Sequence, residues 1–165
     1  MIVLGIDPGT ATTGYGIIEK RGRGVFKCLA SGTINTKPSQ AAHERLNIIY
    51  KELSKIIRET QPDILVMERI FLFKNFKTII TVSQAQGIIM LAAAKKKIPL
   101  YQFTPLQVKL TVVGYGKAQK KEVEKKVKQF LKLRKLPSKS DDAVDALAIA
   151  LTYYFKNEKG SGKKT

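Results

Sequence analysis

The chain has 165 residues, of which 30 are Lys or Arg and 13 are Asp or Glu, so its formal net charge is +17. This length corresponds to one domain, and 44% of hydrophobic residues is enough to build a buried core. The excess of positive charge favours a polyanionic partner, of which nucleic acid is the commonest. One cysteine and one histidine exclude an internal disulfide, a cysteine zinc site and a multi-histidine metal site.

The N-terminal segment has no basic region and reaches an acid at Asp7, so it is not expected to be a signal peptide. No apolar run has the length of about 18 residues that a membrane-spanning helix needs. The single cysteine suits a reducing compartment. We therefore expect a cytoplasmic protein that does not enter a membrane.

The first 35 residues are predicted to form three β-strands. Residues 2–6 are a continuous apolar run, typical of a strand buried on both faces, and a Pro-Gly turn follows Asp7. Residues 13–19 and 24–35 have the β-branched and aromatic content of strands, and the glycine-containing loop 21–24 predicts a hairpin between them. The three strands are expected to be consecutive and antiparallel.

Helices and strands alternate in the rest of the chain. Apolar residues at three- and four-residue spacing predict a helix over 39–60, and the apolar run 64–68 predicts a strand parallel to the first. We further expect helices over 76–97, 105–113, 118–133 and 141–155 and a strand over 100–103. This order predicts an α/β fold, a mixed five-stranded sheet flanked by helices. Residues 1–155 would form this domain and residues 156–165 a basic, disordered tail.

Four acidic residues lie where this fold would bring them together. Asp7 ends the first strand, Glu68 ends the neighbouring parallel strand, and Asp142 and Asp145 share one face of the last helix. Buried carboxylates are costly unless they are paired or bound to a metal. Mg²⁺ prefers oxygen ligands, and two such ions can activate water and stabilise the leaving oxygen of a phosphodiester. An acidic site on a basic surface is the pattern expected of a metal-dependent nuclease.

Each of these acids also has a simpler interpretation when it is taken alone. Asp7 could start a turn, Glu68 could pair with a nearby cation, and Asp145 could be a solvated acid favoured by the helix dipole. Asp141 or Asp142 could cap the last helix, and Asp141 is the better candidate for that role. The joint placement of four acids at two strand ends and on one helical face favours a common site.

Four short motifs occur in order along the chain. They are Gly5-Ile6-Asp7-Pro8-Gly9-Thr10, Met67-Glu68 followed by Phe71 and Lys74-Asn75, Gln107-Val108-Lys109 with Thr111-Val112-Val113-Gly114, and Asp142-Ala143-Val144-Asp145-Ala146-Leu147-Ala148. This ordered set resembles the RuvC family of bacterial Holliday junction resolvases from residue 1 to about residue 152. The resemblance implies the RNase H-like fold of the retroviral integrase superfamily.

The resemblance also implies the site and its metal. Asp7, Glu68, Asp142 and Asp145 would be the catalytic residues and the metal ligands, with Asp141 as the alternative to Asp142 if the helix register differs. The metal would be Mg²⁺, with two ions per site, or Mn²⁺.

By the same resemblance the protein would be a homodimer that nicks two opposed strands of four-way junction DNA, leaving 5′-phosphate and 3′-hydroxyl ends. It would act in recombination and repair beside a branch-migration complex of RuvA and RuvB. Phe71 occupies the position of the family's junction-probing aromatic, Lys74 lies beside it, and Lys109 and Lys120 match positions that contact DNA. The apolar helix around residues 79–94 would form the dimer interface.

Three other functions are compatible with parts of the pattern. A strand that ends in Asp-x-Gly-Thr also begins actin-like and sugar-kinase ATPases, but 165 residues leave no room for their second half. Another nuclease of the same fold, acting on RNA–DNA hybrids, would use the same acids. A non-catalytic junction-binding protein would not be expected to keep all four.

Overall fold

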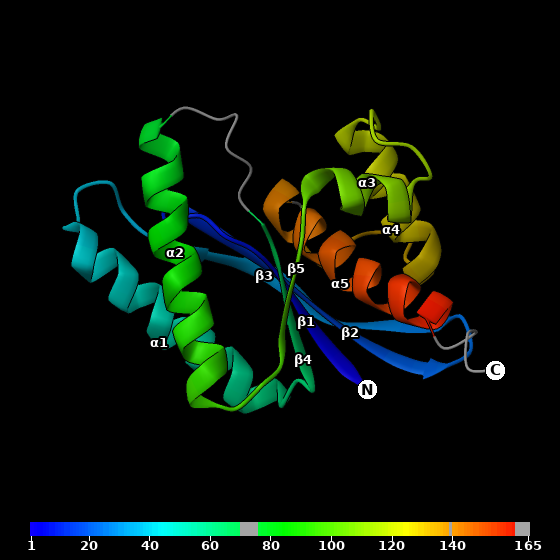
Figure 1. The fold of residues 1–165 in the computed structure, drawn as a ribbon, viewed down its shortest axis with the longest axis horizontal. Helices are drawn as coiled ribbons and strands as arrows, with labels where there is room; N and C mark the ends of the chain where they lie inside the picture. The colour runs from blue at the N-terminus through cyan, green and yellow to red at the C-terminus, as the bar shows by residue number, and fades with distance from the viewer. Residues whose placement is uncertain (70–75, 139, 161–165) are drawn as a thin grey trace.

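A computed structural model of the chain describes residues 1–69, 76–138 and 140–160 (Figure 1). Its elements are β1 (Ile2–Asp7), β2 (Thr12–Gly22), β3 (Val25–Asn35), α1 (Ala42–Thr60), β4 (Ile64–Glu68), α2 (Phe76–Lys95), β5 (Leu100–Phe103), α3 (Pro105–Val112), α4 (Lys120–Leu131) and α5 (Asp141–Gly160). They form one five-stranded sheet of order β3-β2-β1-β4-β5. Strands β1, β4 and β5 are parallel, whereas β2 is antiparallel to both β1 and β3. The predicted mixed α/β fold is confirmed.

All five described helices differ by one to five residues from the sequence-based expectation; α3 ends at Val112 rather than at 113, and α4 spans Lys120–Leu131 rather than 118–133. Helix α1 starts at Ala42 rather than at residue 39. At this start the Glu44 carboxylate accepts a hydrogen bond of 2.9 Å from the Ala41 amide. Helix α2 stops at Lys95, two residues before the left-handed backbone of Lys97 (φ 55°). Helix α5 runs to Gly160 instead of ending near residue 155. The proposed division into a domain and a tail stays a prediction.

The sheet separates two hydrophobic cores. Helices α1 and α2 cover one face, and α3, α4 and α5 cover the other (Figure 1). Alternate residues of β1 enter different cores, since Val3 packs toward α5 and Leu4 packs toward α1 and α2. Burial on both faces explains why β1 and β4 read as continuous apolar runs. Among the described residues no helix combines the length and apolar character required to cross a membrane.

Helix α5 lies unusually close to the centre of the sheet because the strands present glycine beneath it. A Cβ atom at Gly5 would lie 2.1 Å from the Ala146 carbonyl oxygen, and one at Gly14 would lie 2.0 Å from the Asp142 carbonyl oxygen. Both distances are far shorter than any tolerated contact, so only glycine fits there. Gly14 is also the residue that pairs with Asp7 across the β1–β2 ladder. The close approach therefore places the first turn of α5 beside Asp7.

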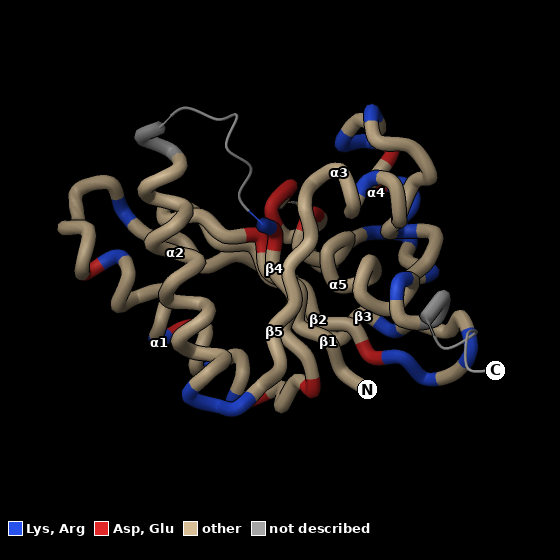
Figure 2. The backbone as a smooth tube through the Cα atoms, in the orientation of Figure 1, with Lys and Arg blue, Asp and Glu red and all other residues tan. Residues whose placement is uncertain are grey.

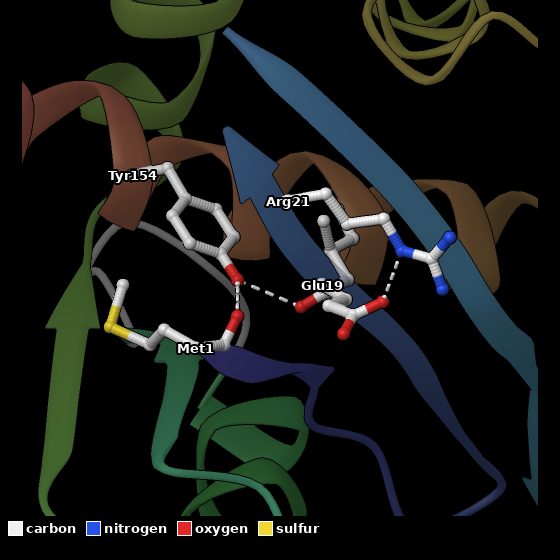
Figure 3. Close-up of polar contacts among 5 residues, drawn as sticks. Met1, Glu19, Arg21 and Tyr154 are labelled. Carbon is white, nitrogen blue, oxygen red and sulfur yellow. Dashed lines mark hydrogen bonds and ion pairs between the residues drawn. The ribbon is translucent and has the colours of Figure 1, made fainter. Parts of the chain in front are cut away.

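The C-terminal half of α5 is held against β2 and the residue before β1 by the Tyr154 side chain (Figure 3). Its hydroxyl lies 2.8 Å from the carbonyl oxygens of Met1 and Ile18 and donates its hydrogen between them. Burial of the ring raises the pKa of Tyr154 well above its ordinary value. Nearby, Arg21 and Glu19 form an exposed ion pair of 2.7 Å, a kind of contact that adds little stability.

The glycine contact can be tested by adding a methyl group. Gly14→Ala should lower the free energy of unfolding by about 3 kcal/mol or more, because the methyl group meets helix backbone that cannot move alone. Gly22→Ala is the control, because its Cβ would meet only the Val25 side chain at 3.9 Å and should change stability by less than about 1 kcal/mol. Urea denaturation measures both, and equal stability of the two variants would contradict the close packing.

Candidate active site

The four acids are positioned by two strand ends and one helix start. Asp7 is the last residue of β1 and Glu68 the last residue of β4, and these strands are neighbours in the sheet. Asp142 and Asp145 lie in the first turns of α5. Figure 2 shows acidic backbone segments meeting at this edge of the sheet, with Lys and Arg along α4 and around it. The structure thus brings together all four residues that were predicted to form the site.

These side chains share one cavity of about 470 Å³. Its charged lining consists of the four acids and of Lys109 from α3 and Lys120 from α4. Its other wall is mainly apolar and is formed by Pro105, Val108, Val123 and Ile149. Sequence analysis did not identify these apolar lining residues, because a valine that faces a cavity has the same helical spacing as one that faces a core.

The backbone around Glu68 is held from both sides. The Gln86 side-chain amide of α2 donates a hydrogen bond of 2.7 Å to the Glu68 carbonyl. The amide of the next residue, Arg69, donates one of 2.8 Å to the Phe103 carbonyl at the end of β5. These contacts fix the point at which β4 ends, and with it the position of the Glu68 Cα atom at the cavity.

Asp7 lies in an environment that disfavours its charged form. Burial, followed by the negative charges of Glu68, Asp145 and Asp142, raises its pKa from 3.8 to about 8, and Lys120 opposes this rise only in part. Burial also raises the pKa of Asp145, again with Lys120 acting in the opposite direction. The cavity therefore holds more negative charge than its own cations neutralise.

Lys120 lies close to the acids of α5. Its ammonium lies 3.5 Å from an Asp141 carboxylate oxygen and 3.8 Å from one of Asp145. The negative charge of Asp145 is the main reason why the pKa of Lys120 is raised. Asp141 itself lines a separate cavity of about 260 Å³ together with Lys120 and Asp145. The larger cavity therefore contains Asp142 and not Asp141.

The site can be compared with what a divalent cation requires. Among residues 1–69, 76–138 and 140–160, no three His, Cys, Asp or Glu side chains are arranged closely enough to coordinate a metal ion. The donor chemistry nevertheless fits Mg²⁺ or Mn²⁺, because the four acids offer only carboxylate oxygens to one cavity. The high pKa of Asp7 also arises from charges that a bound cation would offset.

Two of the predicted DNA-contacting residues, Lys109 and Lys120, line the cavity. The other two, Phe71 and Lys74, lie outside the described residues. Asp141 is the first residue of α5 rather than the residue before it, and the Ser140 hydroxyl lies 3.4 Å from an Asp142 carboxylate oxygen. The capping role considered for Asp141 is therefore not the role it has in the structure.

The order of the strands, and the placement of acids at the carboxyl ends of the inner strands β1 and β4, define an RNase H-like domain with a carboxylate site of the nuclease type. The family model for the crossover junction endodeoxyribonuclease RuvC matches residues 3–153, so the chain belongs to the RuvC family. Members of this family are metal-dependent nucleases.

Individual relatives agree with this assignment over nearly the whole chain. The crossover junction endodeoxyribonuclease RuvC of Finegoldia magna is 49% identical over 155 residues, which cover 94% of this chain and 93% of that protein. The protein of the same name from Natranaerobius thermophilus is 47% identical, with coverage of 93% and 94%. The structure of T. thermophilus RuvC in complex with Holliday junction substrate has a TM-score of 0.91 at 32% identity, covering 98% of this chain and 97% of that one.

The raised pKa of Asp7 predicts a pH-dependent stability without divalent cations. Between about pH 4 and pH 8 the folded protein retains a proton that the unfolded chain releases, so stability falls as the pH rises through this window. Asp7→Asn removes that dependence and should stabilise the protein by on the order of 2 kcal/mol at pH 8, with little effect near pH 4. Urea denaturation in chelator at both values measures the difference. The exposed control Asp141→Asn should give no such gain. A gain equal to that of Asp7→Asn would contradict the raised pKa of Asp7 as the cause.

Proposed function

We propose that this chain is a metal-dependent endonuclease that resolves Holliday junctions by nicking two opposed strands symmetrically, in DNA recombination and repair. The cuts would leave 5′-phosphate and 3′-hydroxyl ends. The observation that carries the proposal is the convergence of Asp7, Glu68, Asp142 and Asp145 on one cavity in a member of the RuvC family. The net charge of +17 and the junction complex of the T. thermophilus relative support four-way junction DNA as the substrate.

In this proposal the four acids are the catalytic residues and hold two Mg²⁺ ions, which Mn²⁺ can replace. The bound ions would supply the charge that activates water and stabilises the leaving oxygen. The charges of Glu68 on β4 and of Asp142 and Asp145 on α5 all raise the pKa of Asp7, so Asp7 is our candidate for the shared ligand. The apolar wall formed by Val108, Val123 and Ile149 restricts water on one side of the reacting phosphate.

The cations beside the acids would hold the DNA backbone. Lys109 and Lys120 enter the cavity itself, where their ammonium groups can contact phosphates next to the cut. Outside it, α4 buries Val123, Val127 and Leu131 and turns its charged face to solvent. Exposed cations in and around α4 are Lys117, Lys121, Lys125, Lys132, Arg134 and Lys135. Phe71 and Lys74 complete the proposed set of DNA contacts by their place in the family motif.

A homodimer would give two sites for two symmetric cuts. Residues 79–94 of α2 contain no charged side chain, although one side of this helix faces away from the sheet. On that side Ile80, Met90 and Leu91 are 61%, 49% and 45% exposed. Apolar surface of this kind is typical of an interface, and a second copy of the chain would cover it isologously.

Two finer parts of the proposal follow from family membership. Cooperation with the branch-migration complex of RuvA and RuvB would supply the junctions, and the chain would act in the cytoplasm, where bacterial DNA is processed. Both belong to the proposal and are independent of the chemistry of the cavity.

Cleavage of a synthetic mobile four-way junction tests the proposed activity. With Mg²⁺ or Mn²⁺ the protein should produce paired symmetric nicks whose ends a ligase can join, whereas linear duplex and an RNA–DNA hybrid should stay intact. Chelator should abolish cutting, and Asp7→Asn should reduce it by about 100-fold or more. Glu52→Gln, an exposed acid of α1, is the matched control and should cut normally. Cutting of the RNA–DNA hybrid alone would overturn the junction as the proposed substrate but would leave the proposed metal site in place.

Sedimentation of a charge variant tests the dimer. Leu91→Glu places a charge on the apolar side of α2 and should convert a dimer into a monomer, because burying an unpaired carboxylate in an interface is costly. Paired nicking should then give way to single nicks. Leu29→Glu on β3, where the leucine is 39% exposed, is the control and should remain dimeric. A wild-type protein that sediments as a monomer would overturn this part of the proposal.

A further inference from the structure

Three large apolar side chains lie exposed beside the acidic cavity. Leu106 and Leu110 of α3 are 56% and 48% exposed, and Tyr115 in the following loop is 46% exposed. A Cβ atom at Gly116 would lie 2.3 Å from the Leu106 Cδ1 atom and 3.9 Å from the Leu110 Cγ atom. The loop therefore runs directly against both leucines. We call Leu106, Leu110 and Tyr115 the apolar platform.

The apolar platform borders the cavity because α3 contributes to both. Pro105, Val108 and Lys109 of this helix line the cavity. Leu106, Lys109 and Leu110 are three and four positions apart and so are neighbours on one helix surface. A phosphate held by Lys109 would therefore place the rest of its nucleotide next to the two leucines.

The Tyr115 ring is held in position before any ligand binds. Its hydroxyl donates a hydrogen bond to one carboxylate oxygen of Glu122, and the other carboxylate oxygen accepts one of 2.8 Å from the Gln119 amide. The loop leaves α3 through Gly114, whose φ of 105° is a conformation that glycine adopts readily. A surface fixed in this way loses little conformational freedom when it binds.

The charges around the apolar platform indicate what covers it. Residues 104–119 include Lys109 and Lys117 and contain no acid, and Lys120 follows directly. The Glu122 carboxylate beside Tyr115 is engaged by the Tyr115 hydroxyl and the Gln119 amide. A ligand that matches this surface carries negative charge next to a flat apolar group. A nucleotide has this combination, because its phosphate is anionic and its base can stack on an aromatic ring whatever its sequence.

We propose that Leu106, Leu110 and Tyr115 bind an unpaired base of the DNA strand whose phosphate lies at Lys109. This inference rests on the proposed function and adds a base-binding site to it. The Tyr115 ring provides the stacking surface, and the leucines contact the edge of the base or its sugar. The site would favour junctions in which a base near the cut has left its pair, since a fully stacked duplex offers no free base.

Fluorescence of 2-aminopurine tests the base-binding site without requiring cleavage. Four-way junctions carry the probe singly at each position flanking the cut, and binding is measured in chelator. At one or more positions wild-type protein should quench the probe through stacking. Tyr115→Ala should abolish the quenching and weaken junction binding about tenfold, a typical loss for one stacked base. Tyr115→Phe keeps the ring and should restore most of the quenching.

Matched leucine variants separate the apolar platform from general surface effects. Leu106→Ala and Leu110→Ala should reduce both quenching and affinity, whereas Leu29→Ala on β3 should change neither. Equal melting temperatures will show that the variants are folded. Quenching and affinity that are unchanged in Tyr115→Ala and Leu106→Ala would overturn the base-binding site, while junction cleavage by the wild type would keep the proposed function. A wild-type protein that neither binds nor cuts junctions would overturn both.

Discussion

Helix α5 can rest on the middle of the sheet only because β1 and β2 have glycine at the points of contact. At Gly5 and Gly14 the backbone of the strand meets the backbone of the helix, and no side chain fits between them. This packing decides how far along the sheet the helix begins, and thereby where Asp142 and Asp145 lie relative to Asp7. The geometry of the site is thus set by regular secondary structure, which holds catalytic groups more accurately than loops do.

The same packing has an energetic consequence. It collects carboxylates at a buried strand end, where desolvation and mutual repulsion raise the pKa of Asp7 to about 8. Lys120 offsets only part of this charge, since it is shared between Asp145 and the exposed Asp141. Residues kept in an unfavourable environment by the surrounding fold are typical of functional sites, where stability is lost in exchange for activity.

Sequence patterns predicted every strand, the order of the helices and the four acids of the cavity, because these depend on local periodicity and on the ends of buried runs. Other features depend on contacts between distant segments. Lys120 forms ion pairs with both Asp145 and Asp141, whereas the sequence had suggested a helix cap for Asp141. The bond between Tyr115 and Glu122 has no periodic signal. Helix α5 extends beyond residue 155 although its last turn is polar, and hydrophobic patterning does not define such an end.

The sheet also divides the molecule into two halves, each with its own hydrophobic core and its own set of helices. Helices α1 and α2 pack on one face with their own core, and α3, α4 and α5 pack on the other with theirs (Figure 1). If a second copy covers α2 and DNA contacts α3 and α4, as proposed, the two partners meet helices on opposite faces of the sheet. Substitutions that tune assembly can therefore accumulate independently of those that tune recognition of the junction. The Glu68 carbonyl, which accepts a hydrogen bond from Gln86 of α2, is one point at which the two halves are linked.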